Sequence, residues 1–298
     1  MGEDFLPQLF YNMRKVLIEN EIGRLQEIMG IEMSEGFDDL GNPDFKYYAF
    51  DWDDNLMFMP TEIIVMSYGG QEVGMSTSDF AEYREKIGSE NFEYKGHTIV
   101  DFAEDPFRNF SFKGDEQFVK DSMVAKTGPS WNDFVECING GSIFAIITAR
   151  GHSPQALREG VEVIVKEGRA GLSYQECVKS LKKYKGVIEG DDEKMFQEYL
   201  DLCRFHPVSY GDAGQASKPE EAKIVALEEF IKHVNALSEQ LKMDMELEND
   251  IKNNFVPTVG FSDDDTKNVE NVKNYLSTRQ GDDEINVYLT KDDNKIKV

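Results

Sequence analysis

The hydrophobic positions of this chain fall into two kinds of pattern. Continuous apolar runs, which are typical of strands buried on both faces, occur at 47–50, 142–147 and 255–261. Apolar residues three and four positions apart predict amphipathic helices, at 6–29, 116–126, 131–138, 154–165, 173–184, 193–203, 219–234 and 269–276. Shorter apolar pieces predict strands at 62–68, 98–102, 207–210 and 285–289. Because strands alternate with helices, we expect an α/β fold built on a doubly wound parallel sheet.

Two helix starts are marked by capping residues. Ser153 is followed by Pro154, a pair that suits the N-cap and the first position of a helix. The segment Ser217-Lys218-Pro219-Glu220 combines a Ser cap, a Pro in the first turn and a Glu three residues after the cap. Lys218 is therefore expected at a helix N-terminus, where unpaired amides also favour anions.

The composition predicts a folded and strongly acidic protein. Of the 298 residues, 40% are hydrophobic, which suffices for a buried core and excludes global disorder. Lys and Arg number 32 and Asp and Glu 57, so the formal net charge is −25. Such a charge repels nucleic acids and anionic membranes, because binding to phosphates relies on Lys and Arg. Neither is expected as a partner, and the oligomeric state stays open.

Cysteine usage indicates a reducing compartment. Cys137, Cys177 and Cys203 are widely spaced and odd in number, as free thiols are. The histidines are equally scattered, so no zinc site is suggested. The acidic N-terminal residues lack the pattern of a signal peptide, and no apolar stretch reaches the length of a membrane span. We expect a cytoplasmic protein.

Acidic or hydroxyl side chains follow each of the three continuous apolar runs. Asp51 and Asp53 follow the first, Thr148 follows the second, and Asp263 and Asp264 follow the third. Parallel strands end at one edge of a sheet, where ligands bind, so we expect these groups to meet there together with the lysine at the later helix start. Carboxylates, a hydroxyl and a lysine around one point suit Mg²⁺-assisted phosphoryl transfer.

The order of these motifs resembles that of the haloacid dehalogenase-like (HAD) hydrolases. Asp51-Trp52-Asp53-Asp54-Asn55 is similar to the first motif of that family, and Ile146-Ile147-Thr148-Ala149-Arg150 to the second. Lys218-Pro219 is similar to the third motif, and Gly260-Phe261-Ser262-Asp263-Asp264 to the fourth. The resemblance extends from about residue 47 to 276 and implies a HAD-like core with an inserted cap.

The resemblance implies a catalytic role for four residues. Asp51 would be the nucleophile and form an aspartyl-phosphate, and Asp53 would protonate the leaving group and then activate water. Thr148 would bind the phosphoryl oxygens, and Lys218 would balance the negative charge. An acid at the position of Asp53 is absent from family members that cleave carbon–halogen bonds or pump ions, so a phosphatase is implied.

The resemblance also implies a metal site and a class of substrate. Mg²⁺ would be held by Asp51, the main-chain carbonyl of Asp53 and Asp263, with Asp264 as a further ligand or a neighbour of the ligands. The substrate would be a small phosphorylated metabolite or nucleotide. Two alternatives stay open: a non-catalytic HAD-like binding or structural protein, and a phosphatase acting on nucleic-acid ends.

Several positions depart from the family pattern. Asn55 stands where Thr or Val is usual, and Asp54 stands where Gly is frequent. The long separation of Lys218 from Asp263 leaves Lys223 as an alternative for the lysine role. Arg150 and His152, which follow the second motif, are expected on an exposed loop, with substrate contact as the alternative.

The spacing of the motifs divides the chain into four parts. Residues 1–45 would be an N-terminal helical extension, and 46–59 with 131–280 the core. Residues 60–130, inserted between the first and second motifs, would form the cap, and 281–298 a charged C-terminal tail. A cap excludes water from a site and restricts access to small substrates.

Overall fold

The computed structural model describes residues 45–181, 188, 190–211, 218–244, 257–279, 284–291 and 294–298. The helix expected at 6–29 and nearly all of the expected extension lie outside these residues. The strands are β1 Phe45–Phe50, β2 Met57–Phe58, β3 Ile63–Ser67, β4 Glu72–Met75, β5 Phe92–Tyr94, β6 His97–Phe102, β7 Lys126–Thr127, β8 Phe144–Thr148, β9 Arg204–Pro207, β10 Pro257–Asp263, β11 Glu284–Lys291 and β12 Asn294–Lys297. The helices are α2 Thr77–Tyr83, α3 Asp115–Val124, α4 Trp131–Asn139, α5 Pro154–Lys166, α6 Tyr174–Leu181, α7 Asp192–Leu202, α9 Pro219–Asp244 and α11 Thr266–Thr278. Short 3₁₀ turns lie at η1 Arg108–Phe110, η2 Phe112–Gly114 and η3 Arg169–Gly171.

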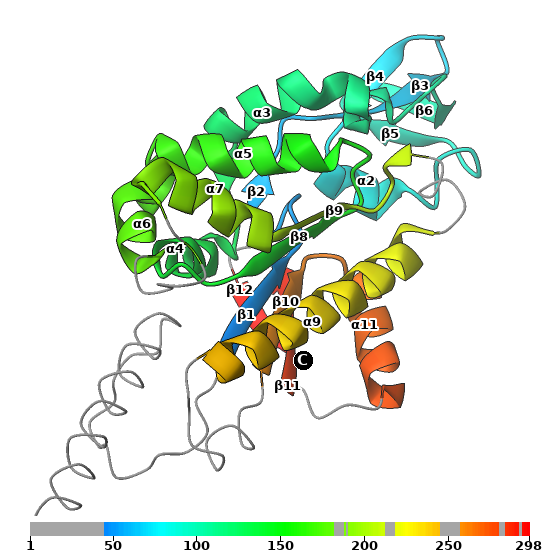
Figure 1. Cartoon of the computed structure of the whole chain (residues 1–298). Helices are drawn as coiled ribbons and strands as arrows, with labels where there is room; N and C mark the ends of the chain where they lie inside the picture. Colours follow the sequence, from blue (N-terminus) through cyan, green and yellow to red (C-terminus); the bar gives the residue numbers. More distant parts are fainter. Residues whose placement is uncertain are drawn as a thin grey trace, which may run out of the picture.

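A six-stranded sheet with the order β12-β11-β10-β1-β8-β9 forms the centre of the molecule (Figure 1). All neighbours in this sheet pair in parallel except β12, which pairs antiparallel with β11. The chain order of the strands reverses at β1, which lies between β10 and β8. The protein is therefore a mixed α/β structure with a predominantly parallel sheet.

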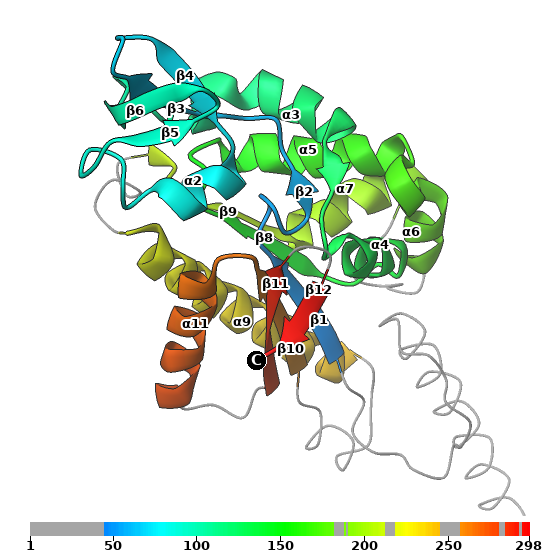
Figure 2. The same cartoon turned by 180° about the vertical axis from the view of Figure 1, so that it is seen from behind.

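Helices cover both faces of β1, as the alternation of side chains along a strand requires. Tyr47 faces α9, where its hydroxyl lies 2.7 Å from the Oγ of Ser238. Phe50 faces the other way and packs edge-to-face against Phe134 of α4, with ring centroids 5.6 Å apart. In Figure 2, β10, β11 and β12 lie in front of α9, so α9 covers the opposite face of that part of the sheet. The helix α11 contacts α9, β10 and β11.

A second, antiparallel sheet with the order β4-β3-β6-β5 lies beyond the carboxyl ends of the main strands (Figure 1). It has a small core of its own, which includes Val65, Met75 and Ile99. The chain enters and leaves this sheet at one place, because Ile64 donates a hydrogen bond to the carbonyl of Pro106 and accepts one from the amide of Ala103. Together with α2 it fills residues 63–102 of the expected insertion at 60–130.

Two segments differ from the sequence-based expectations. The helix α3, inside the expected insertion, packs against α5, and its Phe118 belongs to the main core. Residues 284–291 and 294–297, in the expected charged tail, form β11 and β12 of the main sheet. Alternating Ile285, Val287 and Leu289 provide the apolar face that packs against this core.

The capping pattern at Ser153 is confirmed. Its side chain accepts a hydrogen bond from the amide of Ala156, and Pro154 opens α5. The helix α9 begins at Pro219, while Ser217 lies outside the described residues. None of the helices in the described ranges combines the length and the apolar character needed to cross a membrane.

Candidate active site

The acidic and hydroxyl residues predicted from the sequence lie at one edge of the main sheet. Asp51 directly follows β1, Asp263 is the last residue of β10, and Thr148 is the last residue of β8. In the sheet register Phe50 pairs with Ser262 on one side and with Ile146 on the other. All three polar side chains are buried. The parallel pairing thus brings residues from distant parts of the chain to a common point.

Lys223, not Lys218, supplies the cation at this point. The Nζ of Lys223 lies 3.0 Å from Oδ1 of Asp51 and donates a 2.7 Å hydrogen bond to Oδ2 of Asp263. Lys218 precedes α9 and is exposed, and the structure does not bring it to the carboxylates. Lys223 is buried because it continues the stripe of α9 that also carries Leu227 and Phe230, at helical spacing.

Three carboxylates form a cluster that could hold a cation. Oxygen atoms of Asp51, Asp263 and Asp264 all lie within 4.8 Å of one another. With Lys223 as the neighbouring cation, the ionised cluster keeps an excess of negative charge, which a divalent ion would neutralise. Hard oxygen ligands of this kind suit Mg²⁺. The donor set therefore fits the ion that the sequence predicts, although it does not identify it.

The pKa values of the cluster reflect its burial and its crowding. Burial, together with the charges of Asp263 and Asp53, raises the pKa of Asp51 from 3.8 to about 8, although Lys223 opposes this shift. Burial, together with the charges of Asp263 and Asp51, raises the pKa of Asp264 well above its usual value. For Lys223, burial favours the neutral form, but the carboxylates of Asp263 and Asp51 outweigh it and raise the pKa. The lysine is thus charged, but its single positive charge is not enough to keep the pKa values of Asp51 and Asp264 in their usual range.

Asp263 is fixed by further hydrogen bonds. Its Oδ1 accepts the amide of Asp265 at 2.9 Å and the side-chain amide of Asn268 at 3.0 Å. Asp265 in turn caps α11 by accepting the amide of Lys267. The start of α11 therefore holds the end of β10 in place.

Asp53 lies apart from this cluster and is bound by Arg150. Arg150 donates from Nε to Oδ2 of Asp53 at 2.7 Å and from Nη2 to Oδ1 at 2.6 Å. The expectation of an exposed loop at Arg150 and His152 is wrong, because both side chains are only 1% exposed. His152 packs against Phe118, and burial lowers its pKa to about 3.

Asn55 connects the segment that follows β1 to three other segments of the chain. Its Nδ2 donates to the carbonyl of Asp51 at 3.0 Å and to the carbonyl of Ser262 at 3.1 Å. Its Oδ1 accepts from the hydroxyls of Ser130 at 2.8 Å and Thr290 at 2.9 Å. All of these side chains are buried. The departure from the family pattern at this position therefore has a structural account: a longer amide side chain serves four partners that a Thr could not reach together.

Asp54 also has a structural explanation. Its φ of 54° lies in the left-handed region, which Gly, Asn and Asp adopt most readily. Its carboxylate hydrogen-bonds Thr77 of α2, and burial raises its pKa to about 6. The turn that follows Asp51 thus contacts α2.

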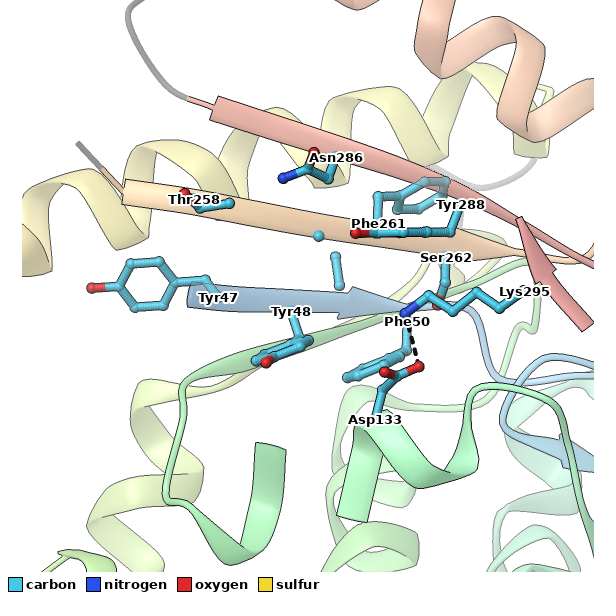
Figure 3. A pocket seen from close by; sticks show the side chains of 12 residues that line it. Tyr47, Tyr48, Phe50, Asp133, Thr258, Phe261, Ser262, Asn286, Tyr288 and Lys295 are labelled. Carbon is cyan, nitrogen blue, oxygen red and sulfur yellow. Dashed lines mark hydrogen bonds and ion pairs between the residues drawn. The ribbon is translucent and has the colours of Figure 1, made fainter. Parts of the chain in front are cut away.

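A pocket of about 230 Å³ lies along the strands that end at the carboxylate cluster, and none of the cluster's three acids lines it. It opens over β1, β10 and β11 on the face opposite α9, between Tyr48 and Tyr288 (Figure 3). One end is closed by the ion pair of Lys295 with Asp133, at 2.7 Å. Ser262, which lines the pocket, precedes Asp263 in the chain.

The sequence therefore identifies most members of the site, but not their partners. It identifies Asp51, Asp263 and Asp264, which come together, and Thr148, which lies at the same edge. The paired hydrogen bonds from Arg150 to Asp53 and the contacts of Asn55 could not be predicted from the sequence. The only signal for these two residues is that they lie within or next to the motifs. Comparison with known proteins finds no match, whether among family models, curated proteins or solved structures.

Proposed function

We propose that this protein is a Mg²⁺-dependent phosphohydrolase with a HAD-like, doubly wound core and an inserted cap. It would remove the phosphate from a small phosphorylated metabolite or nucleotide. The observation that carries the proposal is the position of Lys223 between Asp51 and Asp263, with Asp264 beside them at the carboxyl edge of the sheet. The fold resemblance rests on the four motifs and on the reversal of strand order at β1.

In the first step a carboxylate oxygen of Asp51 attacks the phosphorus of the monoester. The bond from phosphorus to the leaving oxygen breaks, and that oxygen takes a proton from the carboxyl group of Asp53. Lys223 offsets the negative charge on Asp51 and the phosphoryl group. The hydroxyl of Thr148, at the end of β8, is available to donate to a phosphoryl oxygen.

In the second step water attacks the phosphorus of the aspartyl-phosphate. Asp53 accepts a proton from that water, and the bond between phosphorus and Asp51 breaks. Inorganic phosphate leaves, and both side chains return to their starting forms. A bound Mg²⁺ would supply positive charge at the phosphoryl oxygens, held by Asp51, Asp263 and Asp264 with the main-chain carbonyl of Asp53.

Two observations bear on the alternatives. The net charge of −25 disfavours nucleic-acid ends as substrates, since it repels a phosphate backbone. The hydrogen bonds of Asn55 to Asp51 and Ser262 remove one reason to suspect a non-catalytic protein, because the unusual residue supports the site rather than interrupting it.

The test is hydrolysis of p-nitrophenyl phosphate by the purified full chain with Mg²⁺. We expect turnover that EDTA abolishes and that Asp51→Asn reduces to background. A panel of phosphorylated sugars and nucleotides then identifies the substrate class. Turnover that survives Asp51→Asn, or no turnover of any phosphate monoester, contradicts the proposal.

A further inference from the structure

Within the part of the chain that the structure describes, the carboxylate of Asp53 is held by one side chain, that of Arg150. We propose that Arg150 is the positioning residue for proton transfer: its guanidinium fixes Asp53 for the leaving group and keeps that carboxylate out of the metal cluster. This inference rests on the proposed phosphohydrolase function and gives Arg150 a role that the resemblance does not assign to it.

The contact between the two side chains defines the orientation of the Asp53 carboxylate. Both oxygens of Asp53 accept hydrogen bonds, one from Nε and one from Nη2 of Arg150, at 2.7 and 2.6 Å. Paired, parallel bonds of this kind set the plane of the carboxylate as well as its distance. No other hydrogen bond or ion pair to the Asp53 side chain is present among the described residues. The orientation of Asp53 therefore depends on Arg150.

Arg150 is itself held by several contacts, although its buried Nη1 has no hydrogen-bond partner among the described residues. Its guanidinium lies over the rings of Phe110 and Phe118, at 4.7 and 5.2 Å from their centroids, and Nη2 also donates to Thr61 at 3.2 Å. Its backbone carbonyl accepts the amide of Ser209, and the amide of Gly151 donates to the carbonyl of Phe110. A group whose supports are packed in this way can hold a reacting side chain in a defined place.

Two cations thus divide the acids of the site. Lys223 pairs with Asp51 and Asp263, which belong to the metal cluster. Arg150 pairs with Asp53, whose carboxylate is not part of that cluster although it follows Asp51 by two residues. The two acids of the first motif thus have different cationic partners.

The test is a double-mutant cycle measured on two substrates. Arg150→Met, Asp53→Ala and the double variant are compared with the unchanged protein on p-nitrophenyl phosphate and on glycerol phosphate. An alkoxide leaving group depends on proton donation far more than p-nitrophenolate does. We expect Arg150→Met to lower kcat on both substrates, and the loss should be about tenfold larger on glycerol phosphate than on p-nitrophenyl phosphate. This difference is of the order that general acid–base catalysis contributes. The double variant should be no slower than Asp53→Ala alone.

The controls separate positioning from folding. Arg158→Met removes an arginine that pairs with Glu162 and Asp201 away from the cluster, and it should leave both rates unchanged. Mg²⁺ should raise the melting temperature of every variant, because none removes a carboxylate of the metal cluster. If Arg150→Met does not fold, Arg150→Lys keeps the charge without the fork and should show the same dependence on leaving group.

Two outcomes overturn the inference. Equal losses on both substrates, or losses of Arg150→Met and Asp53→Ala that multiply in the double variant, show that Arg150 does not act through Asp53. Both results require turnover by the unchanged protein, so they leave the proposed function standing. Absence of Mg²⁺-dependent turnover in the unchanged protein instead removes the proposed function, and this inference with it.

Discussion

The Nζ of Lys223 lies 3.0 Å from Oδ1 of Asp51, deep beneath the surface of the molecule. A helix that crosses one face of the sheet therefore supplies the cation for an acid at the sheet edge. The position of this lysine within α9, rather than at the helix start, decides which residue can balance charge at the site.

Replacement of Lys223 separates the two candidate lysines. Lys223→Met leaves Asp51 and Asp263 buried without their cation, so we expect turnover to fall by about 10²-fold or more and stability by about 3–5 kcal/mol. Lys218→Met removes an exposed side chain and should change neither quantity appreciably. Steady-state kinetics and urea denaturation measure both effects. Equal losses in the two variants would contradict the assignment.

Asn55 is expected to stabilise the fold as well as the site. Asn55→Ala removes the partner of the buried hydroxyls of Ser130 and Thr290, and each unsatisfied group costs about 1–3 kcal/mol. Asn274→Ala, at an exposed position of α11, is the matched control and should be close to neutral. Urea denaturation measures the difference. An Asn55→Ala variant as stable as the control would show that the network contributes nothing.

Metal binding and pH should act on stability in opposite directions. Because the pKa of Asp51 rises from 3.8 to about 8 on folding, the metal-free folded state binds more protons than the unfolded chain between these values. The contribution of protonated Asp51 to the stability of the metal-free fold is therefore present at low pH and is lost as the pH rises toward 8. Mg²⁺ needs ionised ligands, so its stabilising effect should grow over the same range, to about 2.7 kcal/mol at a hundredfold excess over Kd.

Melting temperatures with Mg²⁺ and with EDTA, at pH 5.5 and pH 8.5, provide the measurement. Asp264→Asn should weaken the effect of Mg²⁺, whereas Asp265→Asn should keep it, because Asp265 caps α11 and is outside the cluster. A Mg²⁺ effect that shrinks as the pH rises, or that is equal in the two variants, argues against a metal site at these carboxylates.

The packing of α4 on the sheet can be tested through one aromatic residue. Phe134 is fully buried and contacts Phe50 and Phe144, so Phe134→Ala should destabilise the protein by about 3–5 kcal/mol. Phe112→Ala removes a ring that is 60% exposed and should cost far less. Denaturation midpoints compare the two. Similar midpoints would place α4 away from the sheet.

The sequence predicts the central elements well because burial on both faces leaves a continuous apolar run. The predicted strands at 47–50, 142–147 and 255–261 agree with β1, β8 and β10 within a few residues. The strand expected at 207–210 instead ends at Pro207, because β9 lies at the edge of the sheet and its Arg204, Phe205 and His206 are only partly buried. Edge strands lack the apolar signal that marks central ones.

The partners of the site residues cannot be predicted in the same way. Arg150 lies in a polar loop that follows a buried strand, and a polar loop is expected to be exposed. Its side chain is buried because it packs against Phe110 and Phe118, which lie about 30 to 40 residues earlier in the chain. The choice of Lys223 over Lys218 depends on the rotation of α9 about its axis, which its contacts with the sheet set. Such contacts join residues that lie far apart in the chain, so local sequence patterns do not predict them.

The hydrogen bonds of Ile64 with Ala103 and Pro106 bring the two ends of the smaller sheet together, so the main chain continues almost as if that sheet were absent. Residues 65–102 consequently leave the main chain and return to it at nearly the same place. Recombination or design could replace them with another segment whose ends meet at the same spacing, without rerouting β1 or β8. Changes in this segment could thus alter access to the carboxylate edge while Asp51, Asp263 and Lys223 keep their places.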